Sequence, residues 1–187
     1  MKKLMLSIAI LLSTSTLKSQ EVSVKTNLLY GATLTPNLGF EVGIGKQNSL
    51  ELTMGYSPFD YGDNKNWKHI LVQPEYRRWL CDKFSGSFFG FNLSWAAYNM
   101  GGVDLPFGIW KSLKDYRYQG QAIGAGVTYG YQYPLSLHWS IEAEIGIGYW
   151  HIWSKKYRCE KCSDLLKKEQ KDYVGPSRAA INLIYQF

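Results

Sequence analysis

Eight charged residues are spaced so that their side chains would meet if the segments carrying them paired as strands. They are Lys25, Glu41, Glu51, Glu75, Arg77, Glu142, Glu144 and Arg178. Grouped carboxylates and cations could form an ion path or an acid/base site. They could also be a polar network that fills a narrow interior, and we favour this interpretation because unpaired buried charges are costly.

Three cysteines offer a second kind of chemistry. Cys159 and Cys162 form a Cys-x-x-Cys pair, while Cys81 lies far from them in the sequence. Zinc normally takes four ligands and no second pair is present, so a local disulfide between Cys159 and Cys162 is the simpler expectation for an exported chain. We expect no metal and no cofactor.

Histidines are the candidates for hydrolytic chemistry. His69 and His151 are expected near one rim of the folded chain, and Ser154 follows His151 by three positions. A nucleophile needs a base within hydrogen-bond reach and a third group that orients the base. No strand face carries Ser, His and an acid in that spacing, so we expect no catalytic residue.

These residues lie on segments of about ten residues in which apolar and small polar side chains alternate. A period of two indicates strands. We predict eight strands, at about 22–31, 39–45, 50–57, 68–80, 88–97, 121–133, 139–150 and 177–187. Long loops are predicted at 59–67, 101–118 and 154–176, with short turns elsewhere. We also predict a bulge at Pro74 and a short helix at 163–171.

One face of the predicted strands is rich in Gly, Ala and Ser, as the interior of a narrow barrel requires. Aromatic residues gather at the predicted strand ends. They are Trp79, Trp139 and Phe187 at one rim, and Tyr30, Tyr56, Trp67, Tyr149 and Trp153 at the other. Apolar and polar residues would also alternate along the strands of a soluble barrel, but the two groups of aromatic residues resemble the aromatic girdles of membrane barrels. The expected fold class is therefore all-β, an eight-stranded antiparallel up-and-down transmembrane β-barrel of the outer-membrane type.

The two ends of the chain agree with an outer-membrane location. Residues 1–20 resemble a secretory signal peptide, with a basic start, an apolar run and a small polar exit, which leaves 21–187 as the barrel domain. Tyr185 and Phe187 end the last strand with aromatic side chains. A strand of this kind resembles the closing strand that the barrel-insertion machinery recognises.

Charge and composition argue against some partners. The chain carries +6, which falls to about +3 without the lysines of the leader. We therefore expect no nucleic-acid partner. Basic residues gather at 155–171, where they could meet an anionic lipid surface, although a solvated loop is the simpler interpretation.

Three stretches resemble a known family. They are Lys25–Tyr30, Pro36–Glu41 and Gln73–Leu80. Together they resemble the Bacteroidota family of small outer-membrane barrel proteins of unknown function called DUF3575. The resemblance implies an exported barrel, sometimes encoded beside fimbria-type surface proteins, and implies no catalytic residue.

The sequence thus predicts a non-enzymatic outer-membrane barrel of the cell envelope whose outer loops make contacts, and the family resemblance implies a link to surface-fibre assembly or adhesion. Its expected partners are outer-membrane lipid, the insertion machinery and a surface-fibre or envelope protein. The alternative is a lipid-modifying barrel enzyme that acts at the outer rim through His69 and His151. A narrow channel is a third hypothesis.

Overall fold

The computed structural model describes residues 22–32, 35–60, 66–101, 116–158 and 165–187. Within these ranges the chain forms eight strands and one short helix, α2 (Leu29–Ala32). The strands are β1 (Val22–Asn27), β2 (Asn37–Gly43), β3 (Asn48–Asp60), β4 (Asn66–Trp79), β5 (Gly86–Gly101), β6 (Tyr116–Pro134), β7 (Trp139–Arg158) and β8 (Leu165–Gln186). Among the described residues, no helix is long and apolar enough to cross a membrane.

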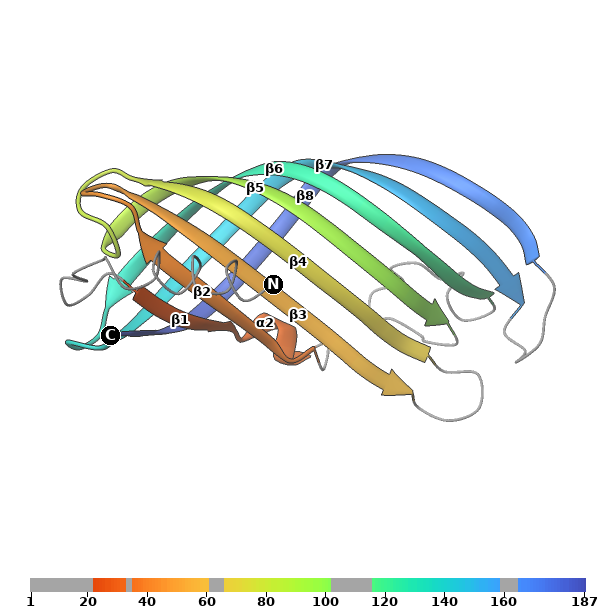
Figure 1. Cartoon of the computed structure of the whole chain (residues 1–187), viewed down its shortest axis with the longest axis horizontal. Coiled ribbons are helices and arrows are strands. Elements are labelled where there is room, and N and C mark those ends of the chain that lie inside the picture. Colours follow the sequence, from red (N-terminus) through yellow and green to blue (C-terminus); the bar gives the residue numbers. More distant parts are fainter. Residues whose placement is uncertain (1–21, 33–34, 61–65, 102–115, 159–164) are drawn as a thin grey trace, which may run out of the picture.

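Each strand pairs antiparallel with its neighbours in the chain, and β8 returns to pair with β1 (Figure 1). The predicted all-β ring of eight antiparallel strands is therefore confirmed. We followed direct cross-strand partners once around the ring, starting at Gln186 of β8. The path returns to β8 at Gly175 and not at Gln186. The strands are thus strongly tilted to the ring axis, as the closure of eight strands requires.

Burial alternates along the strands of the ring. In β1 every second residue is buried, and β5 shows the same alternation from Phe88 to Trp95. The buried side chains are mostly polar or charged, whereas large apolar side chains such as Val127, Ile145 and Ile147 face outward. The interior of the ring is therefore polar and its outer surface apolar.

The strands differ greatly in length. β1 and β2 have 6 and 7 residues, whereas β6, β7 and β8 have 19, 20 and 22. Beyond the short strands, β3 to β8 continue as a curved sheet toward the right of Figure 1. We call this part the sheet extension, and it comprises residues 56–60, 66–70, 97–101, 116–121, 153–158 and 165–170.

The segment between β1 and β2 forms backbone hydrogen bonds with β8 and with β3, the strands on either side of this pair. The backbone N–H of Leu28 donates to the Ile181 carbonyl at 2.8 Å, and the N–H of Tyr56 donates to the Pro36 carbonyl at 3.0 Å. The first predicted strand is therefore too long, because the chain leaves the sheet after β1 and turns into α2. Tyr30, predicted at a rim, lies in α2 and is half-buried.

The predicted loop at 154–176 and the helix at 163–171 are wrong wherever the chain is described. β7 runs on to Arg158 and β8 starts at Leu165, and the two strands pair along this length, Trp153 with Gln170 and Lys155 with Lys168. The described strands β7 and β8 are therefore longer than predicted, and part of the charged segment is strand.

Two further predictions in β4 are corrected. Pro74 causes no bulge, because the register with β3 runs through the Leu52–Pro74 pair without a shift. Shifts in the strand register occur instead between β7 and β8. Trp79 is not a rim residue, because its side chain is buried inside the ring, where it packs on Phe84 and Phe88.

Candidate functional site

All eight charged residues singled out from the sequence lie inside the closed ring. Seven of them have side chains at most 2% exposed, and Arg178 is 4% exposed. They project from six different strands and form one continuous ionic cluster. The members are Lys25, Glu41, Glu51, Glu75, Arg77, Glu142, Glu144 and Arg178.

Arg77 occupies the centre of the ionic cluster. Its guanidinium contacts all five carboxylates, at 2.6 Å for Glu51, 2.7 Å for Glu75, 2.8 Å for Glu142 and Glu144, and 3.2 Å for Glu41. Its Cζ atom also lies 4.2 Å from the centroid of the Phe88 ring. One planar, permanently charged group thus joins carboxylates from four strands.

The other two cations complete the network from the side where the ring closes. Lys25 Nζ lies 2.5 Å from Glu41, 2.9 Å from Glu51 and 3.3 Å from Glu142. Arg178 contacts Glu51 and lies 3.2 Å from Glu75 and 3.0 Å from Glu144. Because Lys25 is on β1 and Arg178 on β8, ion pairs tie the first and last strands to the middle of the sheet.

Neutral donors supply some of the remaining hydrogen bonds. Five carboxylates face three cations, so the cluster has an excess of negative charge. Ser49 Oγ donates to Glu41 at 2.5 Å, Thr53 Oγ1 donates to Glu51 at 2.5 Å, and Asn182 Nδ2 donates to Glu142 at 2.6 Å. These bonds hold the carboxylates that carry most of the ion pairs in fixed positions.

Glycine makes room for the long charged side chains. A Cβ atom on Gly90 would lie 2.6 Å from Oε1 of Glu75, and one on Gly39 would lie 2.7 Å from Cγ of Lys25. Both glycines stand directly beside the strand that carries the charge. The small residues of the predicted inner face therefore complement the charged ones across the ring.

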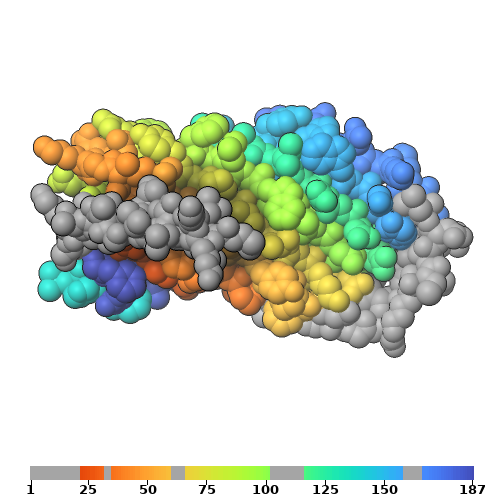
Figure 2. Space-filling view, viewed as in Figure 1, coloured from red at the N-terminus to blue at the C-terminus, as the bar shows by residue number. Residues whose placement is uncertain are grey.

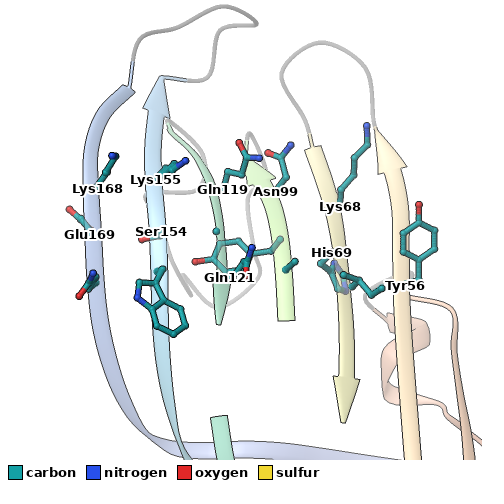
Figure 3. A pocket seen from close by; sticks show the side chains of 16 residues that line it. Tyr56, Lys68, His69, Asn99, Gln119, Gln121, Ser154, Lys155, Lys168 and Glu169 are labelled. Carbon is teal, nitrogen blue, oxygen red and sulfur yellow. The ribbon is translucent and has the colours of Figure 1, made fainter. Parts of the chain in front are cut away.

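A cavity of about 700 Å³ lies in the sheet extension, and we call it the rim cavity (Figure 3). Three consecutive rows of cross-strand partners line it, together with Tyr56. The middle row is His69, Tyr98, Gly120, Ser154 and Glu169. The sequence singled out His69 and Ser154 but not their neighbours in this row. In the sheet extension polar residues occur on both faces of the strands, so apolar and polar residues do not alternate clearly there.

The two rim histidines have different partners. His69 Nε2 lies 3.1 Å from the hydroxyl of Thr35, and its Nδ1 has no hydrogen-bond partner among the described residues. His151 Nδ1 lies 2.5 Å from Asp172, which also accepts a hydrogen bond from the Tyr149 hydroxyl at 2.6 Å.

The acid that pairs with His151 is Asp172, and its hydrogen bonds favour the ionised carboxylate. The hydrogen bonds from Tyr149 and His151 lower the pKa of Asp172 below its ordinary value. Ser154 instead hydrogen-bonds with Tyr98. The described residues therefore form a nucleophile–base pair and a base–acid pair, but no complete catalytic triad.

The cysteines are placed only in part. Cys159 and Cys162 lie outside the described residues, so their pairing stays a prediction. Cys81 is an exposed free thiol at the turn between β4 and β5. In the described part of the chain, no three His, Cys, Asp or Glu side chains are grouped to hold a metal ion.

The carboxyl-terminal aromatic residues lie at the end of the ring that carries the short turns. The N–H of Phe187 donates to the Val22 carbonyl at 3.1 Å. The Tyr185 ring packs edge-on against Trp139 and Phe187, with centroids 5.2 Å and 5.1 Å apart. The two predicted insertion residues thus lie together beside the start of β1.

A ring of eight antiparallel strands with an ionic interior and an apolar exterior defines the class of this molecule. The chain belongs to the family described as "Protein of unknown function (DUF3575)", whose model matches residues 4–187. No curated protein and no solved structure matches the chain.

Proposed function

We propose that this protein is an outer-membrane β-barrel without catalytic activity, which holds its sheet extension at the cell surface for contact with other envelope components. One observation carries the proposal: charged groups are inside the ring and large apolar side chains are outside. In water such an outer surface would be strongly unfavourable, whereas in lipid it is required.

The apolar belt has the dimensions of a membrane. On β6 the outward residues from Ile123 to Tyr133 are Ile, Ala, Val and Tyr, and on β7 those from Trp139 to Tyr149 are Trp, Ile, Ala and Tyr. Strands need about 9–11 residues to cross the hydrocarbon. On β8 the belt extends to Val174, which is 79% exposed.

The ionic cluster argues against a pore. Its charged side chains are almost fully buried and contact one another across the ring, where eight strands leave little more than side-chain space. In this proposal the cluster closes the barrel and fixes its register. The contact function then belongs to the sheet extension, and the family resemblance suggests a surface-fibre or envelope protein as its partner.

Fractionation and conductance test the proposal. The mature protein is expected in outer-membrane fractions, with a gel mobility that changes on boiling, and it should give no conductance steps in planar bilayers. Recovery in a soluble fraction with unchanged mobility would refute the membrane placement. Regular conductance steps would refute the closed interior.

The lipid-modifying enzyme remains a second candidate, because His69, one of the residues that line the rim cavity, lies 3.1 Å from the hydroxyl of Thr35 on the inner face of the sheet. In that mechanism Thr35 Oγ1 would attack the carbonyl of an acyl ester while His69 accepts the hydroxyl proton. The C–O bond to the departing alcohol would then break, His69 would return the proton to that alcohol, and the acyl group would stay on Thr35 until water or an acceptor hydroxyl removes it. Lipid A from cells that carry His69→Ala or His151→Ala should be compared with wild type by mass spectrometry. Unchanged acylation in both variants would eliminate this candidate.

A further inference from the structure

The outward face of the sheet extension carries two rows of side chains that flank the rim cavity. The outer row is Lys68, Asn99, Gln119, Lys155 and Lys168, each directly paired with the next across β4 to β8. The inner row is Ile70, Ala97, Gln121, Trp153 and Gln170. In Figure 3 the outer row lies at one level across five neighbouring strands.

Lys155 and Lys168 stand directly opposite each other at the β7–β8 end of the outer row. Like charges at such positions destabilise a sheet. Among the described residues neither ammonium group has an acidic partner, whereas Glu169 lies 3.2 Å from Lys167 and 3.5 Å from Lys171. A bound anion would relieve the repulsion between the two lysines.

The remaining side chains of the two rows suit a sugar. Gln119, Gln121 and Gln170 are exposed amides that both donate and accept hydrogen bonds. The side-chain oxygen of Asn99 is buried and has no hydrogen-bond partner within the described ranges. Trp153 is 38% exposed and offers a flat apolar surface beside these amides.

The position of the rows selects the source of the ligand. Gln121 precedes the belt residue Ile123 by two positions and lies on the same face of β6. The rows therefore lie directly above the apolar belt, at the level where lipid headgroups begin. A ligand bound there would be part of the outer leaflet.

We propose that the rim cavity binds the phosphorylated sugar headgroup of an outer-leaflet glycolipid, with Lys155 and Lys168 on the phosphate and the amides and Trp153 on the sugar. This inference rests on the membrane placement proposed above. It assigns the sheet extension a lipid partner in addition to any protein partner.

The test compares lipid binding by the wild-type protein and the double variant Lys155→Gln/Lys168→Gln, both folded in a neutral detergent. Binding of diphosphorylated lipid A is followed by native mass spectrometry. Each basic group near an anionic lipid contributes about 1 kcal/mol, so affinity should fall about fivefold for each lysine removed. Trp153→Ala should weaken binding of lipid A and leave binding of phosphatidylglycerol unchanged.

The matched control is Lys156→Gln/Lys167→Gln. These lysines are also direct cross-strand partners and remove the same charge, but they lie on the opposite face of the sheet, where Lys156 covers the Tyr116 ring at 3.6 Å. The control should change lipid A affinity less than twofold. An equal loss in both double variants would overturn the proposal.

Competitors distinguish the possible sources of the anion. Glucosamine 1-phosphate should compete with lipid A, which would support recognition of a sugar phosphate. Equal affinity for phosphatidylglycerol and lipid A, or equal competition by inorganic phosphate, would overturn it. A heat-dependent gel shift of the same samples tests the barrel itself, so a folded, membrane-located protein without lipid A binding refutes this inference alone.

Discussion

At the scale of single residues, Arg77 should be the most sensitive position of the interior. Arg77→Gln keeps a polar side chain but leaves five buried carboxylates with two cations. Removal of one partner from a buried ion pair costs about 3–5 kcal/mol. We expect the folded gel band of Arg77→Gln to be lost at a clearly lower temperature than that of wild type.

The neighbouring arginine provides the control. Arg78 faces outward and hydrogen-bonds with Asn48 at 2.9 Å. Arg78→Gln removes the same charge from the same strand without disturbing the interior, so its melting temperature should stay near that of wild type. Equal destabilisation by both changes would mean that net charge, and not the buried contacts, determines stability.

Gly90 tests the fit between small and large residues inside the ring. A Cβ atom there would lie 2.2 Å from Oγ1 of Thr128 and 2.6 Å from Oε1 of Glu75. Because both neighbours are buried, Gly90→Ala should destabilise the fold by about 1–3 kcal/mol, as overpacking does. Unfolding in urea in the presence of lipid or detergent measures this change.

Gly31 is the matched position for this test. A Cβ atom on Gly31 would have no heavy atom within 4 Å, so Gly31→Ala should leave the unfolding midpoint almost unchanged. If Gly90→Ala unfolds at the same urea concentration as Gly31→Ala, the interior has more space than the structure shows.

The charged residues could be predicted from the sequence because the two-residue period alone assigns them to one face. Glu41, Glu51 and Glu75 are direct neighbours in adjacent strands, as alternation requires once the turns are placed. The same period assigns Trp79 to the inner face with Glu75 and Arg77, and its indole N–H donates to Ser49 at 2.8 Å. The rim prediction for Trp79 rested on its aromatic type at a strand end, and residue type alone does not distinguish a buried ring from an interfacial one.

At the scale of elements, the departure of the chain from the sheet after β1 depends on two asparagines. Asn27 N donates to the side chain of Asn37 at 2.6 Å, and Asn37 Nδ2 donates to the Asn27 carbonyl at 3.0 Å. Oδ1 of Asn27 also accepts bonds from the N–H groups of Leu29 and Ile181. These bonds take the place of regular strand pairing where β1 ends and β2 begins.

Asn27→Ala should therefore loosen the junction of β1, α2 and β8. It leaves several backbone groups without partners, each at a cost of about 1–3 kcal/mol. We expect faster hydrogen exchange at Leu29 and Ile181, with little change at the distant β5–β6 pair. Exchange that rises equally in β5 and β6 would contradict a local role.

The charged end of β7 and β8 explains why its strands were not predicted. Both faces of the hairpin carry lysines at this end, namely Lys155, Lys156, Lys167 and Lys168. Hydropathy therefore does not alternate with a period of two in this segment. Cross-strand hydrogen bonds, and not the burial of an apolar face, define this part of the sheet. Strands were correctly predicted where one face is apolar and the other polar.

At the scale of the whole molecule, the structure consists of a closed ring and an extension that the ring does not need. Ile152 and Lys171 are direct partners across β7 and β8, and residues 153–170 lie beyond them. Replacement of 153–170 by Asn-Gly would join the two strands through a two-residue turn of the type that suits a hairpin. The ionic cluster and the closing β1–β8 pair lie entirely outside the deleted segment.

The shortened protein should insert, show the heat-dependent gel shift and melt within a few degrees of wild type, because its buried ion pairs are intact. It should lose lipid A binding and any partner bound at the extension, since Trp153, Lys155 and Lys168 are gone. Gel mobility and lipid titration on the same sample measure both halves of this prediction. Loss of the gel shift would mean that the extension contributes to closure of the ring, and intact lipid binding would place the headgroup site elsewhere on the barrel.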